Sequence, residues 1–266
     1  MLNRNFNVVL IEDNIIWGDK NANIEQLKRN LRKMPHGVDL VVLPELFTTG
    51  FITGDKEQAA ELAERNTGDT ISTLHQLASE YQVAMCGSFL AATAGQLFNR
   101  AFFIEPNGDD TFYDKRHLFA FGGEDKVYHH GHTQAPIVRF RGMNIKLAVC
   151  YDLRFPVFLR NVRNCYDVLV VVANWPESRQ HVWRNLLMAR AIENECYVCG
   201  VNRAGTDGYG TYYGHCSSFI CDFKGKVIAE RDELSPIVPA SLSPASLEQF
   251  REKFPAWRDA DPFTLL

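Results

Sequence analysis

The sequence lacks any long hydrophobic run and any excess of basic residues. No apolar stretch approaches the roughly 18 residues that a membrane-spanning helix needs. The formal net charge is −4, and no block of Lys and Arg offers a track for a phosphate backbone. The first residues, "MLNRNFNVVL", lack the apolar core of a signal peptide. We therefore expect a cytoplasmic protein that binds neither membranes nor nucleic acids.

The sequence also lacks the cysteine spacing of a disulfide framework or a metal site. Seven cysteines cannot all pair within one chain, and their irregular spacing fits free thiols in a reducing compartment. Cys196 and Cys199 lie in an apolar, strand-like run, where residues three apart point to opposite faces. The sequence "HHGH" at residues 129–132 has no partner cluster at metal-ligand spacing. We expect no metal, and the absence of GxGxxG and P-loop motifs removes support for a nucleotide cofactor.

Short β runs alternate with helical patterns along the 266 residues. The near-continuous apolar run Tyr166–Asn174 is typical of a strand that is covered on both faces. His181–Glu195 places Trp183, Leu187 and Ala191 on one side of a helix. Turns such as "EPNGD" predict hairpins, so the sheets should be mixed. This pattern predicts a layered α/β fold.

The expected elements extend over most of the chain. Strands are predicted at Asn7–Glu12, Val38–Glu45, Val83–Leu90, Leu97–Glu105, Asp110–Asp114, Ile137–Phe140, Ile145–Cys150, Tyr166–Asn174, Cys196–Val201 and Ser217–Cys221. Helices are predicted at Asn23–Lys33, Gly68–Tyr81, Phe158–Asn164 and His181–Glu195. We expect the Pro-rich segment from about residue 236 to residue 266 to form a C-terminal arm.

Three predicted strands end at, or directly before, a residue that carries reactive chemistry: Glu45, Lys115 and Cys150. Strand ends are where α/β folds build their sites. A thiol needs a base or a cation to become a nucleophile, because its free pKa of about 8.5 leaves little thiolate at neutral pH. A carboxylate could accept the thiol proton, and an ammonium could stabilise a tetrahedral oxyanion. The three residues are sufficient for acyl transfer, although each alone also fits a structural role.

The segments around these residues resemble the three signature segments of the nitrilase, or carbon–nitrogen hydrolase, superfamily. They are "LPELFTTGF", "YDKRHLF" and "CYDLRFP", in that order and roughly 70 and 35 residues apart. Residues 174–205 resemble the family segment that follows the cysteine. The resemblance covers roughly residues 5–235. It implies a four-layer αββα sandwich with two mixed β-sheets, a single domain over residues 1–266, no cofactor, and a homodimer or larger homo-oligomer.

The resemblance also assigns roles to individual residues. It implies Glu45 as general base, Lys115 as oxyanion stabiliser and Cys150 as nucleophile. Glu124, in "FGGEDKVYHHG", stands where the family has a second glutamate near the lysine and the base. The backbone N–H of Tyr151 would be the second donor to the oxyanion.

Within the superfamily the chain is most similar to the bacterial ω-amidases, on "CYDLRFP", "VANWP" and "RAIENECYVCGVNR". This implies an amidohydrolase that cleaves the terminal amide of 2-oxoglutaramate, 2-oxosuccinamate and similar amides, through a cysteine thioester. A nitrilase or an N-carbamoyl amide hydrolase would use the same Glu–Lys–Cys site. A Cys–His enzyme would instead need a histidine such as His181 or His215. A non-catalytic binding module is the third alternative.

A substrate carboxylate should meet a cation. Arg154, Arg116 and Arg203 are candidates because they lie near the motifs. Arg154 also fits a structural role, in which it would hold the loop after Cys150 through a buried carboxylate. The aromatic residues that could line a small pocket, with core packing as the alternative, are Phe47, Phe121, Tyr128 and Trp175. The physiological substrate, the oligomer size and the pathway stay open.

Overall fold

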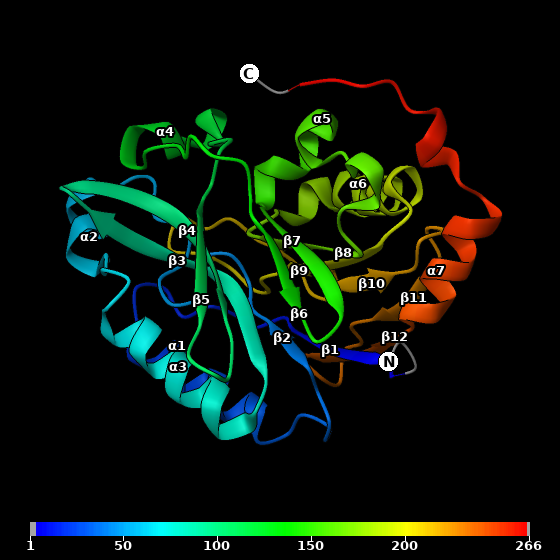
Figure 1. The fold of residues 1–266 in the computed structure, drawn as a ribbon. Coiled ribbons are helices and arrows are strands. Elements are labelled where there is room, and N and C mark those ends of the chain that lie inside the picture. Colours follow the sequence, from blue (N-terminus) through cyan, green and yellow to red (C-terminus); the bar gives the residue numbers. More distant parts are fainter. Residues whose placement is uncertain (1–3, 265–266) are drawn as a thin grey trace.

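Two six-stranded β-sheets form the centre of the protein, in a computed structural model that describes residues 4–264 (Figure 1). The first sheet has the order β12-β1-β2-β3-β4-β5 and the second has the order β11-β10-β9-β8-β7-β6. The strands of the first sheet are β12 (Ile237–Leu242), β1 (Phe6–Ile11), β2 (Leu40–Val42), β3 (Ala84–Thr93), β4 (Gln96–Ile104) and β5 (Asp110–Asp114). Those of the second are β11 (Val227–Glu230), β10 (Phe219–Cys221), β9 (Tyr197–Asn202), β8 (Val168–Ala173), β7 (Met143–Val149) and β6 (Ile137–Phe140).

Both sheets are mixed, as predicted. In the first sheet β1, β2 and β3 are parallel, and the remaining pairs are antiparallel. In the second sheet β7, β8 and β9 are parallel, and β6, β10 and β11 extend it as antiparallel strands. The antiparallel pairs β4–β5, β6–β7 and β10–β11 are hairpins, which the turn sequences indicated.

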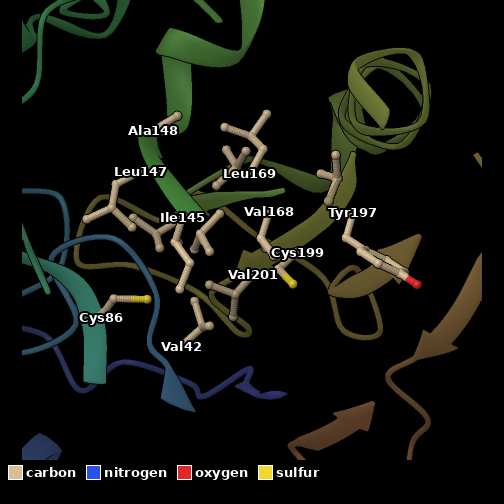
Figure 2. Packing of buried hydrophobic residues seen from close by; sticks show 14 of the residues in the cluster. Val42, Cys86, Ile145, Leu147, Ala148, Val168, Leu169, Tyr197, Cys199 and Val201 are labelled. Carbon is tan, nitrogen blue, oxygen red and sulfur yellow. The ribbon is translucent and has the colours of Figure 1, made fainter. Parts of the chain in front are cut away.

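The two sheets share one hydrophobic core. Val42 and Cys86 from the first sheet lie in the same buried cluster as Ile145, Val168 and Cys199 from the second (Figure 2). Side chains alternate along each strand, so the opposite face of the first sheet supplies a separate cluster. That cluster includes Val9 and Ile11 of β1 together with residues of the helices α1 (Lys20–Leu31) and α3 (Asp69–Tyr81).

The helix α6 (Gln180–Asn194) covers the outer face of the second sheet. Trp183, Leu187 and Ala191 are buried there, as the spacing predicts. Gly200 on β9 permits this close approach, because a Cβ at that position would lie 2.3 Å from Leu187 Cδ1. Helix, sheet, sheet and helix therefore form the four-layer αββα sandwich, and the predicted fold class is confirmed.

The C-terminal region differs from the predicted arm. Strand β12 pairs antiparallel with β1, and Val238 and Leu242 are buried. Helix α7 (Pro244–Lys253) then buries Leu247. The prediction of an arm from residue 236 is therefore wrong for residues 237–253. In the sequence, Pro239 disfavours a strand, because proline has no backbone N–H to donate. Strand β12 lies at the edge of its sheet, where the missing N–H is tolerated.

Other differences are local. The short helix α2 (Lys56–Leu62) was not expected. The expected helix at Phe158–Asn164 is instead α5 (Pro156–Leu159) and a separate 3₁₀ turn, η3 (Val162–Asn164). The chain leaves the helical conformation between them, at Arg160 and Asn161, whose ψ angles are 131° and 84°. No helix within residues 4–264 is both long enough and apolar enough to cross a membrane.

Candidate active site

The strands bring the three predicted residues to one place. Glu45 follows β2, Lys115 follows β5 directly, and Cys150 follows β7 directly. Lys115 Nζ lies 2.9 Å from Glu45 Oε1, although 70 residues separate them. Cys150 and Lys115 line the same cavity. The proximity that the sequence could only suggest is therefore present in the fold.

Lys115 lies between two glutamates. Its Nζ donates to Glu45 Oε1 and to both carboxylate oxygens of Glu124, each at 2.9 Å. All three residues are buried. Burial alone would lower the pKa of Lys115, but the charges of Glu124 and Glu45 outweigh it and raise that pKa well above its usual value. Burial and, secondarily, the charge of Glu45 raise the pKa of Glu124, while Lys115 opposes the shift.

Two asparagines fix the carboxylate of Glu45. Asn99 Nδ2, on β4, donates to Glu45 Oε1 at 2.7 Å. The backbone N–H of Asn174 donates to Glu45 Oε2 at 2.7 Å. Ser88 Oγ in turn donates to Asn99 Oδ1 at 2.9 Å, which orients the amide. Asn99 and Ser88 were not predicted as site residues, because in the sequence they look like ordinary polar residues within strands.

Cys150 occupies the sharp turn between β7 and the 3₁₀ helix η2 (Cys150–Arg154). Its φ is +46°, a left-handed conformation that is uncommon for a residue other than glycine. Burial raises the pKa of its thiol well above the usual value, the charge of Glu45 adds to this shift, and Lys115 opposes it. The thiol is therefore protonated at neutral pH, and its activation requires a proton acceptor.

Asp152 holds the nucleophile turn to the lysine segment. Its Oδ1 accepts from His117 Nδ1–H at 2.7 Å and from the His117 backbone N–H at 3.1 Å. Its Oδ2 accepts from the Tyr113 hydroxyl at 3.0 Å and from the Val149 backbone N–H at 3.1 Å. Asp152 is fully buried. The sequence does not single out Asp152, because its partners Tyr113 and His117 lie 39 and 35 residues away along the chain.

The cavity next to Cys150 has a volume of about 330 Å³. Its wall combines aromatic residues with charged ones. The wall includes Lys115, Phe119, Cys150, Tyr151, Arg154, Trp175, Arg179 and Asp207. A cavity of this size holds a small molecule.

The sequence model of the carbon–nitrogen hydrolase family matches residues 10–252. The chain belongs to this family. It is 41% identical over 259 residues to an omega-amidase, YafV, of Escherichia coli strain K12, covering 97% of this chain and 98% of that protein. It is 30% identical over 252 residues to a 2-oxoglutaramate amidase of Bacillus subtilis strain 168, covering 94% and 95%.

A solved structure agrees with this assignment. XC1258 from Xanthomonas campestris, a CN-hydrolase superfamily protein with an arsenic adduct in its active site, is 37% identical. Its TM-score is 0.92, and the match covers 98% of this chain and 99% of that one. The predicted family, the fold and the class of enzyme, a hydrolase of carbon–nitrogen bonds, are confirmed.

Of the predicted substrate residues, Arg154 and Trp175 line the cavity of this carbon–nitrogen hydrolase. Arg154 Cζ lies 5.1 Å from the centre of the Trp175 ring. Arg154 is exposed and forms no ion pair within residues 4–264, so the alternative of a buried carboxylate partner does not hold. Tyr151 also lines the cavity, and its ring lies 5.2 Å from that of Phe119.

The other aromatic candidates lie elsewhere. Phe47 does not line the cavity: it packs edge-on against Phe102, with 5.9 Å between ring centres, in the core beneath α1 and α3. Tyr128 is buried behind Phe51, whose ring lies parallel to it at 6.5 Å. Phe121 is 93% exposed. An aromatic residue next to a motif can therefore pack in the core instead of binding substrate. The sequence does not distinguish these two roles.

The remaining polar candidates do not line the cavity either. Arg116 donates to the carbonyl of His132. Arg203 is buried, and its guanidinium donates to backbone carbonyls that include those of Ala204 and Ile15. His181 and His215 are absent from the cavity wall, so the geometry gives no support to a Cys–His pair. Cys196 and Cys199 are buried free thiols, as predicted.

Proposed function

We propose that this enzyme is an ω-amidase, which hydrolyses the terminal amide of short 2-oxo acid amides such as 2-oxoglutaramate and 2-oxosuccinamate. The relatives named omega-amidase and 2-oxoglutaramate amidase support this substrate class. The observation that carries the proposal is a small cavity with Cys150 and Lys115 in its wall, together with Arg154, four residues beyond Cys150. Arg154 is an exposed cation that forms no ion pair with the described residues 4–264. That arrangement suits an amide at one end of the substrate and a carboxylate at the other.

The proposed mechanism has two halves. Glu45 accepts the thiol proton as Cys150 Sγ attacks the amide carbonyl, and Lys115 with the Tyr151 N–H stabilises the oxyanion. The C–N bond breaks, ammonia leaves with the proton from Glu45, and a thioester remains on Cys150. Glu45 then takes a proton from water, which attacks the thioester and releases the acid and the thiol. Glu45, Glu124 and Lys115 together place a net negative charge beside the Cys150 thiol. This charge favours transfer of the thiol proton to Glu45.

A nitrilase or an N-carbamoyl amide hydrolase remains the second candidate, because the same residues would perform those reactions. The experiment is ammonia release from 2-oxoglutaramate, glutamine, a nitrile and an N-carbamoyl compound at equal concentrations. We expect 2-oxoglutaramate to give the highest kcat/KM. A preference for glutamine, or for either of the other two classes, would overturn the proposed substrate.

We also propose that the enzyme is cytoplasmic and a homodimer or larger homo-oligomer. Exposed apolar side chains support the assembly: Val157, Val162, Ile192 and Phe254 are each 48% exposed or more. Sedimentation at micromolar concentration tests it, and a monomeric mass would contradict it.

A further inference from the structure

Two arginines, Arg154 and Arg179, lie on the cavity wall. Arg154 ends η2, and Arg179 ends the 3₁₀ turn η4 (Glu177–Arg179). Within residues 4–264, neither guanidinium forms an ion pair or a hydrogen bond. Unpaired arginines in a concave site are candidates for binding an anion.

Each of these guanidinium groups lies over an aromatic ring of the same wall. Arg154 Cζ lies 5.1 Å from the centre of the Trp175 ring, and Arg179 Cζ lies 5.5 Å from that of Phe119. All five N–H groups of a guanidinium lie in its plane. A guanidinium that contacts a ring instead of a carboxylate therefore keeps its donors free for a ligand, and the ring restricts its motion.

Within residues 4–264, no acidic side chain of the cavity wall pairs with either arginine. Lys115 is already paired with Glu45 and Glu124. Asp207 is the acidic residue of the wall, and its carboxylate accepts from the Tyr213 hydroxyl at 2.9 Å and from two backbone N–H groups. The cavity thus offers two unpaired cations, so a bound molecule gains most if it carries a negative charge.

The backbone of Arg179 is held in place by the same tryptophan that supports Arg154. Trp175 Nε1–H donates to the Arg179 carbonyl at 2.9 Å. Glu177, the first residue of the turn, donates its backbone N–H to the Tyr212 carbonyl at 3.1 Å. Trp175 therefore fixes the relation between the two arginines before any substrate arrives, which lowers the entropy cost of binding.

From these contacts we infer that Arg179 is a specificity-determining residue, which binds the substrate carboxylate together with Arg154. This inference rests on the proposed function. A 2-oxo acid presents two carboxylate oxygens and an adjacent ketone oxygen, which together can accept from two guanidinium groups. The pair would then select 2-oxo acid amides over uncharged amides of the same length.

The test compares two amides that differ only at this end. They are 2-oxoglutaramate and 4-oxopentanamide, in which a methyl group replaces the carboxylate. We expect Arg179→Gln to lower kcat/KM for 2-oxoglutaramate about 10- to 100-fold, mostly through KM, because the substrate carboxylate loses a charged hydrogen-bond donor. Its kcat/KM for 4-oxopentanamide should stay within about threefold, since the reacting groups are unchanged.

Two further variants complete the design. Arg179→Lys keeps the charge without the planar fork and should restore part of the preference. Arg184→Gln is the matched control, because Arg184 pairs with Glu230 on the surface, outside the cavity wall. An Arg179→Gln enzyme that keeps the full preference would overturn the role of Arg179 and leave the proposed function intact. An unmodified enzyme that cleaves neither amide would overturn both.

Discussion

The carboxylate of Asp152 lies 2.7 Å from His117 Nδ1, and this contact joins the segment that carries Cys150 to the segment that carries Lys115. The two segments belong to different sheets, because β5 leads into Lys115 and β7 leads into Cys150. Asp152 is therefore a positioning residue whose partners set the distance between the thiol and the ammonium.

Asp152→Asn should lower both activity and stability. The Asn side chain replaces one acceptor oxygen by an NH₂ group, so donors from His117, Tyr113 or Val149 lose their partner. We expect a loss of about 1–3 kcal/mol in the free energy of unfolding, together with a fall in kcat. Urea denaturation and steady-state kinetics measure these effects. Asp167→Asn is the control: Asp167 bonds Asn144 and Arg251 outside the cavity wall, so it should cost stability and leave kcat unchanged.

Glu45→Gln should remove the proton acceptor while it keeps the shape of the side chain. The Gln oxygen can still accept from the Asn174 N–H, so the backbone around the site is retained. We expect kcat to fall by about 10²- to 10⁴-fold, the usual contribution of a general base. His181→Ala and His215→Ala should leave turnover unchanged. An active Glu45→Gln enzyme, combined with an inactive histidine variant, would favour a Cys–His mechanism instead.

Cys150→Ala should abolish turnover in a protein that remains folded. The sulfur makes one weak polar contact, at 3.9 Å to the Asn174 carbonyl, so its loss leaves few groups unsatisfied. Alanine also carries a Cβ and therefore keeps the strain of the left-handed φ. Ammonia release and circular dichroism test the two parts of the prediction. Residual amidase activity would contradict a thioester on Cys150.

The stability of the Cys150→Ala variant should depend less on alkaline pH than that of the unmodified enzyme. Burial, with the charge of Glu45, raises the pKa of Cys150 well above 9.0, the value expected in the unfolded chain. Above pH 9 the unfolded chain has therefore lost a proton that the folded chain retains, and stability falls as pH rises. This contribution is at most about 1.4 kcal/mol per pH unit. Urea denaturation from pH 8 to pH 10 should show a steeper decline for the unmodified enzyme than for Cys150→Ala, and equal slopes would refute the shift.

Tyr128→Phe should leave activity unchanged and should not destabilise the protein. The Tyr128 hydroxyl is buried and has no hydrogen-bond partner within residues 4–264, and the residue does not line the cavity. Removal of a buried unsatisfied hydroxyl should stabilise the fold by about 1 kcal/mol. Thermal denaturation and kcat/KM for 2-oxoglutaramate measure the outcome. A large rise in KM would instead support the sequence prediction that Tyr128 contacts the substrate.

The sequence by itself determined the α/β class, most strand positions and the three strand ends that carry Glu45, Lys115 and Cys150. These features are local: hydrophobic periodicity selects each element, and short motifs mark the reactive side chains. The edge strand β12 was not predicted. Its Pro239 is compatible with a strand only at the edge of a sheet, and the sequence does not show which strands lie at an edge.

Only the tertiary structure decided which polar residues meet. Asn99 donates to Glu45 across 54 positions, and His117 reaches Asp152 across 35. The structure also decided which arginines can reach a substrate. Arg154 and Arg179 lie in the cavity wall. Arg116 and Arg203 do not, although their positions near the motifs made them equal candidates in the sequence. The physical reason is that burial, pairing and the direction of a side chain arise from packing between layers. No spacing along one chain encodes them locally.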